Sequence, residues 1–255
     1  MGKILDVGIL NINTNNPSYS SLEKTLAVLE KSKTLGLDLI IGPEWGLMNN
    51  NVDEKPLNYK KFAKLLDYIK GISKQSDTLI MPGTAVISTK SKNMYNVMPV
   101  FYRGKVIFST IKKADGGTSF FGNERYRLVG RNYSIENTFQ WKGLNIGIEI
   151  CADSGRLYYE RKNELDIQIL SSCGMRDTNL SIGDNKYLIC SDGDHSPGIN
   201  HYIIKNLRAE PGKKPGDYMD LYEPMKYLCN LYRHYFDFLQ ANKRYRNLEV
   251  YRIHL

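Results

Sequence analysis

The sequence has little of what marks a secreted, membrane-spanning or metal-bound protein. Its 255 residues include four cysteines, Cys151, Cys173, Cys190 and Cys229, with no CxxC pair and no histidine at metal-ligand spacing. That pattern argues against a disulfide framework and a structural zinc site. No apolar run approaches the roughly 18 residues that cross a bilayer, and the N-terminus lacks the apolar stretch and cleavage site of a signal peptide. We therefore expect a cytoplasmic protein with no membrane contact.

Several catalytic and ligand-binding motifs are also missing. There is no GxSxG elbow, which argues against a serine hydrolase of that type. The lysines of PGKKPGD are followed by neither serine nor threonine, so this segment is not a phosphate-binding loop. The cluster of Asp192, Asp194 and His195 lacks the spacing of a calcium loop or a zinc site. We expect a polar turn there and no metal ion.

The charge of the chain is positive but dispersed. Lysine and arginine number 35 against 27 aspartates and glutamates, which gives a net charge of +8. Such a balance can attract nucleic acid or another acidic partner. The basic residues are interspersed with acidic ones, and the densest basic stretches are short. A solvated surface and no nucleic-acid partner are therefore expected.

The order of apolar segments in the first third predicts an α/β fold. Residues 4–11, 37–42 and 78–83 are short apolar runs typical of buried strands. Between them lie two amphipathic helix patterns, one that includes Leu22, Leu26 and Leu29 and one over residues 62–72. A β-α-β-α-β order implies right-handed crossovers and a sheet with helices packed on it.

The rest of the chain is less regular. Residues 97–113 predict two strands joined by a tight turn at Arg103-Gly104, and residues 114–138 predict a long surface loop. Residues 144–150 and 165–172 predict two more strands, and residues 186–193 a further one. An amphipathic helix is expected between Met225 and Leu239, followed by a closing strand over residues 248–253.

Three ionisable side chains follow predicted strands, where the active sites of α/β sheets gather. They are Glu44, Cys151 and one of the neighbouring lysines Lys112 and Lys113. Together, a carboxylate can take the thiol proton, the thiolate can attack a carbonyl or nitrile carbon, and an ammonium can stabilise the developing anion. Alternation along the strand favours Lys112, and Lys113 stays the alternative.

These segments resemble the carbon–nitrogen hydrolase, or nitrilase, superfamily. LDLIIGPEW looks like the family's strand-Pro-Glu segment, and YNVMPVFYRGKVIFSTIKK resembles its Tyr-Asn strand, turn and lysine-bearing strand. The family spacing from the turn glycine falls on Lys112. GLNIGIEICAD is similar to the family's Gly-x-x-Ile-Cys-x-Asp segment, with Gly147, Ile150, Cys151 and Asp153 in matching places. The similarity covers about two thirds of the chain.

The resemblance implies an α-β-β-α sandwich of two facing mixed sheets with outer helices. It makes Cys151 the nucleophile, Glu44 the general base and Lys112 the group that stabilises the anion, with no cofactor. The backbone amide of Ala152 follows the nucleophile and is placed to share in that stabilisation.

Many members of the family carry a second, assisting glutamate in the loop between the lysine and the cysteine. Glu124 has the matching spacing to a following glycine, and Glu136 is its competitor. The chain departs from the family after the cysteine, where Ala152 replaces the usual aromatic residue and SGRLYYERK replaces the usual Phe-Pro-Glu stretch.

We therefore expect hydrolysis of a small-molecule amide, and less readily of a nitrile, through a thioester at Cys151. Two alternatives stay open. One is an N-acyltransferase that uses the same cysteine, and the other is a catalytically degenerate binding module for an acidic partner. We expect a hydrolase domain over residues 1–210 and an extension over residues 211–255, packed on that domain or on a dimer partner. Assembly into a homodimer or a larger homo-oligomer is expected.

Overall fold

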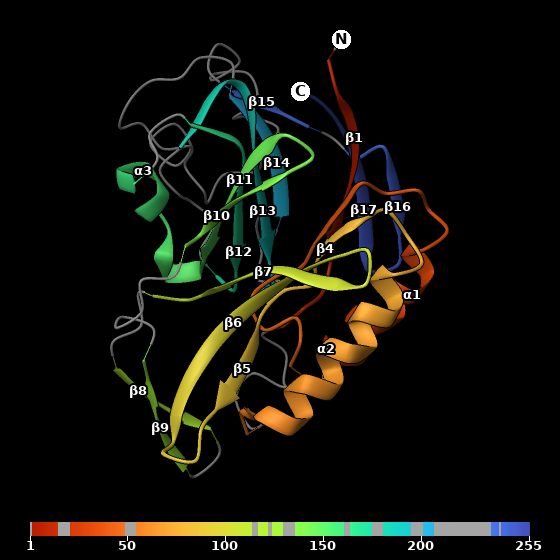
Figure 1. Ribbon diagram of the computed structural model, residues 1–255. Coiled ribbons are helices and arrows are strands. Elements are labelled where there is room, and N and C mark those ends of the chain that lie inside the picture. Colours follow the sequence, from red (N-terminus) through yellow and green to blue (C-terminus); the bar gives the residue numbers. More distant parts are fainter. Residues whose placement is uncertain are drawn as a thin grey trace.

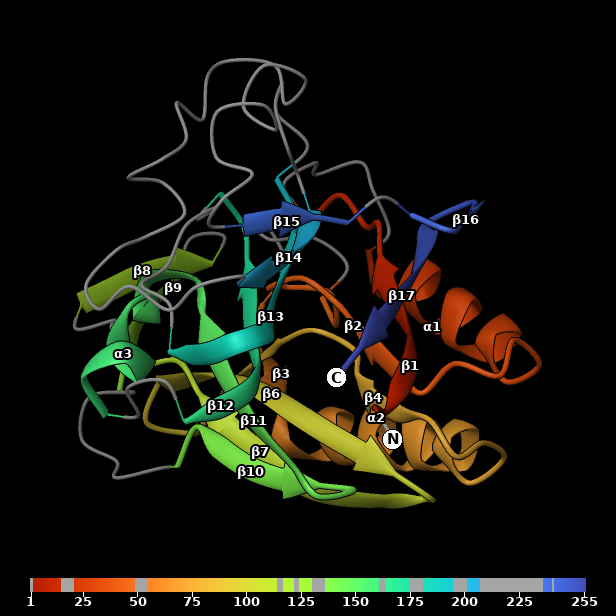
Figure 2. The ribbon, with the colours of Figure 1, turned by 90° about the horizontal axis from the view of Figure 1, so that it is seen from above.

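The structure is a computed structural model that describes residues 2–14, 21–48, 55–113, 117–121, 124–129, 136–160, 164–174, 181–194, 201–206, 236–239 and 241–255. Within these ranges two β-sheets face each other, and helices lie on their outer sides (Figure 1). Figure 2 shows α1 (Ser21–Ser32) and α2 (Tyr59–Ser73) on one side of the molecule and α3 (Arg156–Glu160) on the other. This is the α-β-β-α sandwich predicted from the sequence.

The first sheet has 11 strands in the described residues and is organised around three parallel ones. β1 (Ile4–Leu10), β2 (Leu39–Ile41) and β4 (Leu79–Met81) are neighbours in the sheet. α1 and α2 connect them and bury apolar side chains against the outer face. The predicted β-α-β-α-β order is confirmed, with the short strand β3 (Leu57–Asn58) added before α2.

The predicted hairpin is also present in the first sheet. β6 (Asn93–Tyr102) and β7 (Lys105–Ile111) pair antiparallel. Arg103 and Gly104 join them with φ of 48° and 77°, the two left-handed residues that a two-residue type I′ turn requires. β5 (Ala85–Ser88) pairs with the first half of β6.

The C-terminal residues complete the other edge of the first sheet. β17 (Leu248–His254) pairs antiparallel with all of β1, and β16 (Lys243–Tyr245) pairs with β17. The N- and C-terminal strands therefore lie side by side (Figure 1).

The prediction of a long loop over residues 114–138 is wrong in part. β8 (Gly117–Phe121) and β9 (Glu124–Leu128) form a hairpin within it, and β10 (Thr138–Trp141) begins at its end. β9 also pairs with the start of β6, where Asn93 lies opposite Arg127. Pairing with a strand some thirty positions earlier supplies backbone hydrogen bonds that the polar composition of the segment does not reveal.

The second sheet has six strands in the described residues, in the order β10, β11 (Leu144–Ile150), β12 (Leu165–Ser172), β13 (Ile182–Asp192), β14 (His201–Asn206) and β15 (Phe236–Phe238). β11, β12 and β13 are parallel. The strands predicted over residues 144–150 and 165–172 have these same bounds in the structure, whereas the one predicted over residues 186–193 starts earlier, at Ile182.

The helix predicted between Met225 and Leu239 is wrong at its C-terminal end. Residues 236–238 form β15, which pairs with β14, and the N–H of Leu239 donates to the carbonyl of Ile203 at 2.9 Å. A Phe-Asp-Phe triplet fits the two-residue period of a strand as well as a helical face, and the open edge of β14 selects the strand. The rest of that predicted helix, Cys229 and the boundary after residue 210 lie outside the described residues.

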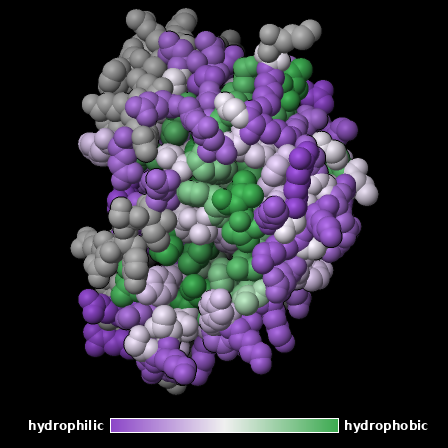
Figure 3. All heavy atoms as spheres, viewed as in Figure 1, coloured by the Kyte–Doolittle hydropathy of each residue, from purple (hydrophilic) through white to green (hydrophobic). Residues whose placement is uncertain are grey.

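The space between the sheets is filled by apolar side chains from both. β1, β2 and β4 supply part of this layer, and β11, β12 and β13 supply the opposing part. At one edge Phe108 of β7 stacks on Phe139 of β10 with ring centroids 4.7 Å apart. On the surface seen in Figure 3, which has the viewing direction of Figure 1, apolar side chains gather near the middle, over β6 and β7. None of the helices in the described ranges is long and apolar enough to cross a membrane.

Candidate active site

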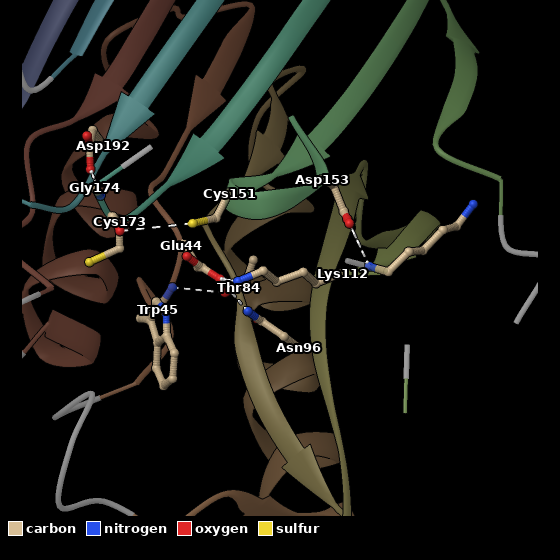
Figure 4. A network of polar contacts seen from close by, with 11 residues as sticks. Glu44, Trp45, Thr84, Asn96, Lys112, Cys151, Asp153, Cys173, Gly174 and Asp192 are labelled. Carbon is tan, nitrogen blue, oxygen red and sulfur yellow. Dashed lines mark hydrogen bonds and ion pairs between the residues drawn. The ribbon is translucent and has the colours of Figure 1, made fainter. Parts of the chain in front are cut away.

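The carboxyl ends of parallel strands from the two sheets meet at one place. β2 of the first sheet leads to Glu44, and β11 of the second leads to Cys151. The end of β12 joins the two: the Ser171 hydroxyl donates to the carbonyl of Gly42 at 2.9 Å, and the N–H of Glu44 donates to the carbonyl of Ser172 at 3.2 Å. Glu44, Lys112 and Cys151 point toward one another from three separate segments (Figure 4).

Close backbone packing fixes the loop that carries Glu44. A Cβ atom on Gly42 would lie 2.4 Å from the carbonyl oxygen of Pro82. Gly83 has φ +99°, and a Cβ there would lie 2.2 Å from the carbonyl oxygen of Pro43. Only glycine fits such approaches. The N–H of Trp45 donates to the Thr84 hydroxyl at 2.9 Å and holds the next residue of the loop.

The carboxylate of Glu44 is buried and receives two hydrogen bonds on one oxygen. Its residue is 1% exposed. Oε1 accepts from the Lys112 ammonium at 2.9 Å and from the Asn96 side-chain amide at 2.7 Å. The Lys112 side chain is itself only 10% exposed. Of the two candidate lysines, Lys112 therefore places its charge against Glu44.

The backbone of the neighbouring Lys113 is hydrogen-bonded to the segment that contains Cys151. Its N–H lies 2.9 Å from both carboxylate oxygens of Asp153, which is 5% exposed. Asp153 ends a 3₁₀ helix, Cys151–Asp153, that follows β11 directly. The strand end that carries Lys112 and the turn that carries Cys151 are thus held together.

Cys151 combines an unusual backbone conformation with a protonated thiol. Its φ is +46°, a left-handed conformation that costs a residue with a Cβ about 1–2 kcal/mol and recurs at functional sites. Burial, and then the negative charge of Glu44, raises the pKa of the thiol to about 12, while the Lys112 ammonium opposes this shift. The sulfur lies 4.0 Å from the carbonyl oxygen of Cys173. At neutral pH the thiol therefore keeps its proton, and the Glu44 side chain is one of its hydrogen-bond partners.

Ala152, whose backbone amide was predicted to help stabilise an oxyanion, directly follows Cys151. Ala152 is the second residue of the 3₁₀ helix and is exposed. The first N–H groups of a helix have no partner within that helix. The 3₁₀ helix itself thus needs no hydrogen bond from this N–H, and its role toward an oxyanion stays a prediction.

The structure does not bring Glu124 to these residues. Its carboxylate forms an ion pair with Lys55, lies 3.4 Å from Lys92 and accepts from the hydroxyl of Tyr126 at 3.1 Å. The hydrogen bond from Lys55, followed by that from Tyr126, lowers the pKa of Glu124 to about 2.

Strand register explains this separation. Arg127 lies opposite Asn93 in the parallel pair of β9 and β6. Glu124 lies three positions before Arg127, and Asn96 lies three positions after Asn93. Six positions at about 3.3 Å each put Glu124 roughly 20 Å from Asn96 along the strands. Its assisting role stays a prediction, and its competitor Glu136 is exposed.

Sequence reasoning gave no role to Asn96. It is 3% exposed, its side chain binds Glu44, and its carbonyl accepts from the N–H of Lys112 at 2.9 Å. The signal was an amide within the apolar strand NMYNVMPVFY, because a buried polar side chain requires a partner.

Known structures share this architecture at low sequence identity. Saccharomyces cerevisiae Nit3, a member of branch 10 of the nitrilase superfamily, is 12% identical, with 83% of this chain and 88% of that chain covered and a TM-score of 0.55. An amidase from Nesterenkonia sp. is 11% identical, with 82% and 88% covered and a TM-score of 0.57. A glutamine-dependent NAD⁺ synthetase from Acinetobacter baumannii is 12% identical over 96% of this chain, with a TM-score of 0.56, and this chain spans 49% of its length.

No protein-family model and no curated protein matches the sequence. More than four fifths of the chain aligns with two of these proteins. The chain therefore has the fold of the carbon–nitrogen hydrolase, or nitrilase, superfamily.

Proposed function

We propose that this protein is a nitrilase-superfamily hydrolase that cleaves a small-molecule amide, with Cys151 as its nucleophile. The observation that supports this is the buried contact of Glu44 with Lys112 at 2.9 Å beside the protonated thiol of Cys151. A base, a cation and a nucleophile are the groups that acyl transfer needs. Amides are proposed ahead of nitriles because structural neighbours include amidases.

In the first half-reaction Glu44 takes the thiol proton as the sulfur of Cys151 attacks the amide carbon. A carbon–sulfur bond forms, and the carbonyl electron pair moves to oxygen. The Lys112 ammonium and the Ala152 N–H stabilise that oxyanion. The carbon–nitrogen bond then breaks, and protonated Glu44 gives its proton to the departing amine, which leaves a thioester on Cys151.

In the second half-reaction water attacks the thioester. Glu44 takes a proton from the water as the carbon–oxygen bond forms, and the same two donors hold the oxyanion. The carbon–sulfur bond breaks, the sulfur recovers a proton from Glu44, and the carboxylic acid leaves. Because Lys112 and Asn96 both bind Oε1 of Glu44, the second carboxylate oxygen suits this repeated proton transfer.

Reagents known for a structural neighbour supply direct probes. In one mutant of the Nesterenkonia amidase, acrylamide adds to the active-site cysteine by Michael addition, and the acetamide moiety of fluoroacetamide adds to it covalently. We propose acrylamide, together with iodoacetamide, as probes of Cys151.

The test compares the labelling rate of each cysteine by limiting iodoacetamide and acrylamide near neutral pH, read by peptide mass. Wild type is compared with Glu44→Gln, Lys112→Ala and the matched surface control Glu30→Gln. We expect Cys151 to react many-fold faster than Cys173, Cys190 and Cys229, and Glu44→Gln alone among the glutamate variants to slow it. A panel of small amides, with ammonia release measured for wild type and Cys151→Ala, follows.

Each outcome assigns the chemistry. Formation of the product acid that requires Cys151 supports the hydrolase. If added hydroxylamine gives more hydroxamate than product acid, the acyltransferase is favoured. An unreactive Cys151, together with salt-sensitive polyanion binding that survives Cys151→Ala, would favour the binding module. A homodimer also stays a proposal, and light scattering on a size-exclusion column measures it.

A further inference from the structure

Two buried polar side chains lie in the apolar outer layer of the second sheet. Glu149 of β11 is 1% exposed, and Gln168 of β12 is 0% exposed. Ile148 and Ile150 pack between the sheets, so alternation along β11 turns Glu149 to the outer face. There its opposite neighbour on β12 is Leu170, part of an apolar cluster under α3.

One hydrogen bond joins these two side chains, and two more connect them to the backbone. Glu149 Oε1 accepts from the N–H of Leu157 at 2.9 Å, and Oε2 accepts from the Gln168 amide nitrogen at 3.1 Å. The Gln168 carbonyl oxygen accepts from the N–H of Ser181 at 2.8 Å. A backbone N–H can only donate, so Ser181 fixes which way the Gln168 amide faces. Gln168 must therefore donate to residue 149, and residue 149 must accept twice.

The position of Glu149 connects this network to the nucleophile. Glu149 lies two residues before Cys151 at the end of β11, and Leu157 lies six residues after Cys151. The hydrogen bond from Leu157 to the Glu149 carboxylate thus joins the two ends of the segment that contains Cys151, Ala152 and Asp153. Cys151 has a φ of +46° within that segment.

A carboxylate is a costly choice for this layer. Moving it out of water carries a desolvation penalty, and a well-packed apolar residue at such a site is often as stable or more so. A buried polar side chain with satisfied hydrogen bonds can, in return for that cost, fix its partners in one arrangement. Here the partner that matters is the start of α3, because Leu157 is its second residue.

We propose that Glu149 is a positioning residue whose hydrogen bonds to Leu157 and Gln168 fix the turn that presents Cys151 and the Ala152 amide. This inference rests on the proposed function, in which Cys151 is the nucleophile. Misplacement of a reacting group by about 1 Å can cost roughly 100-fold in rate. We therefore expect that loss of these hydrogen bonds lowers the reaction rate of Cys151, although Glu149 is not itself a reacting group.

The structure offers a matched exchange as a test. In Glu149→Gln, whichever way the new amide turns, either the Leu157 N–H or the Gln168 amide loses its acceptor. In the double variant Glu149→Gln/Gln168→Glu, the amide introduced at position 149 would accept from Leu157 and donate to position 168, and the new carboxylate would accept from Ser181. All three hydrogen bonds are then restored with the charge moved by one strand.

The experiment measures the iodoacetamide rate of Cys151, amide kcat and KM, and hydrogen exchange of the peptide that contains Leu157. We expect Glu149→Gln to lower the labelling rate and kcat by about 10- to 100-fold, to change KM less, and to speed exchange at Leu157. The double variant is expected to return to within a few-fold of wild type. Ile204→Ala, in the same apolar cluster but on β14, is the control for lost stability.

The outcomes separate the two proposals. A wild-type Cys151 no more reactive than the other cysteines overturns the proposed function and this inference with it. A reactive wild type with an unchanged Glu149→Gln, or with a loss no larger than that of an equally destabilised Ile204→Ala, overturns this inference alone. If Glu149→Gln does not fold, the double variant decides: a folded double variant with slow Cys151 contradicts the proposal.

Discussion

Replacing Lys112 with methionine tests whether the site contains a buried ion pair. The variant keeps the length and much of the volume of the side chain. It removes the ammonium from Glu44, whose side chain is 2% exposed, and leaves the hydrogen bond from the Asn96 amide. Removal of one partner of a buried pair costs about 3–5 kcal/mol, because the other charge stays out of water. We expect a loss of that size at pH 7, measured by urea unfolding.

A double variant separates the buried charge from the lost side chain. Lys112→Met leaves the Glu44 carboxylate out of water without its ammonium, whereas Glu44→Gln removes that charge. Glu44→Gln/Lys112→Met should therefore recover most of the deficit of Lys112→Met.

A surface lysine supplies the comparison. Lys70 pairs with Asp67 at 3.0 Å, with side chains 38% and 74% exposed, and such pairs contribute about 0–1 kcal/mol. If Lys112→Met costs no more than Lys70→Met and the double variant recovers nothing, Glu44 and Lys112 do not form a buried pair, and the reasoning is refuted.

Four further predictions concern single positions. Gly42→Ala is expected to lose about 3 kcal/mol in urea unfolding because its Cβ would meet a backbone oxygen at 2.4 Å, whereas Gly71→Ala, with open space around its Cβ on α2, should gain roughly 0.5–1 kcal/mol; equal effects would contradict the packing. The His201 hydrogen bond, ahead of that from Tyr251, lowers the pKa of Glu249 to about 2, so the stability deficit of Glu249→Gln should be full at pH 7 and fade as pH falls from about 4.5 towards 2; a deficit independent of pH would be inconsistent with this. Burial raises the pKa of the Cys173 thiol from 9.0 to about 12, so the folded state holds its proton longer, and Cys173→Ala should lose less stability than wild type as pH rises above about 9; parallel curves would count against it. Cys151→Gly should be about 1 kcal/mol more stable than Cys151→Ala by thermal unfolding, because glycine is unstrained at φ +46°; the reverse order would exclude strain there.

Local periodicity was enough to locate the strands that bear the site. β11 and β12 are short apolar runs with clear ends, and the residues just beyond such ends gather at one edge of a sheet. Glu44 and Cys151 could therefore be proposed from the sequence together with the family resemblance, and alternation along β7 agreed with the family spacing in favouring Lys112, with Lys113 as the alternative. The structure agrees that the ammonium of Lys112 contacts Glu44.

Features that depend on a distant strand could not be predicted in this way. The β8–β9 hairpin is supported by pairing with β6, and β15 exists because β14 leaves an edge for it. Asn96 binds a carboxylate 52 positions earlier, and the side chain of Gln168 meets Glu149 across two strands. In each case the partner lies far away in the sequence, so the local pattern of polar and apolar residues does not identify it.

The left-handed conformation of Cys151 also offers a way to read relatives of this chain. A single base change converts a cysteine codon to a glycine codon, and glycine fits φ +46° without strain. In a lineage kept only as a scaffold, both mutation and folding would favour that replacement. Under the proposed function, a related sequence with glycine here is expected to have lost the reaction and gained stability, and one that keeps cysteine is expected to keep the reaction.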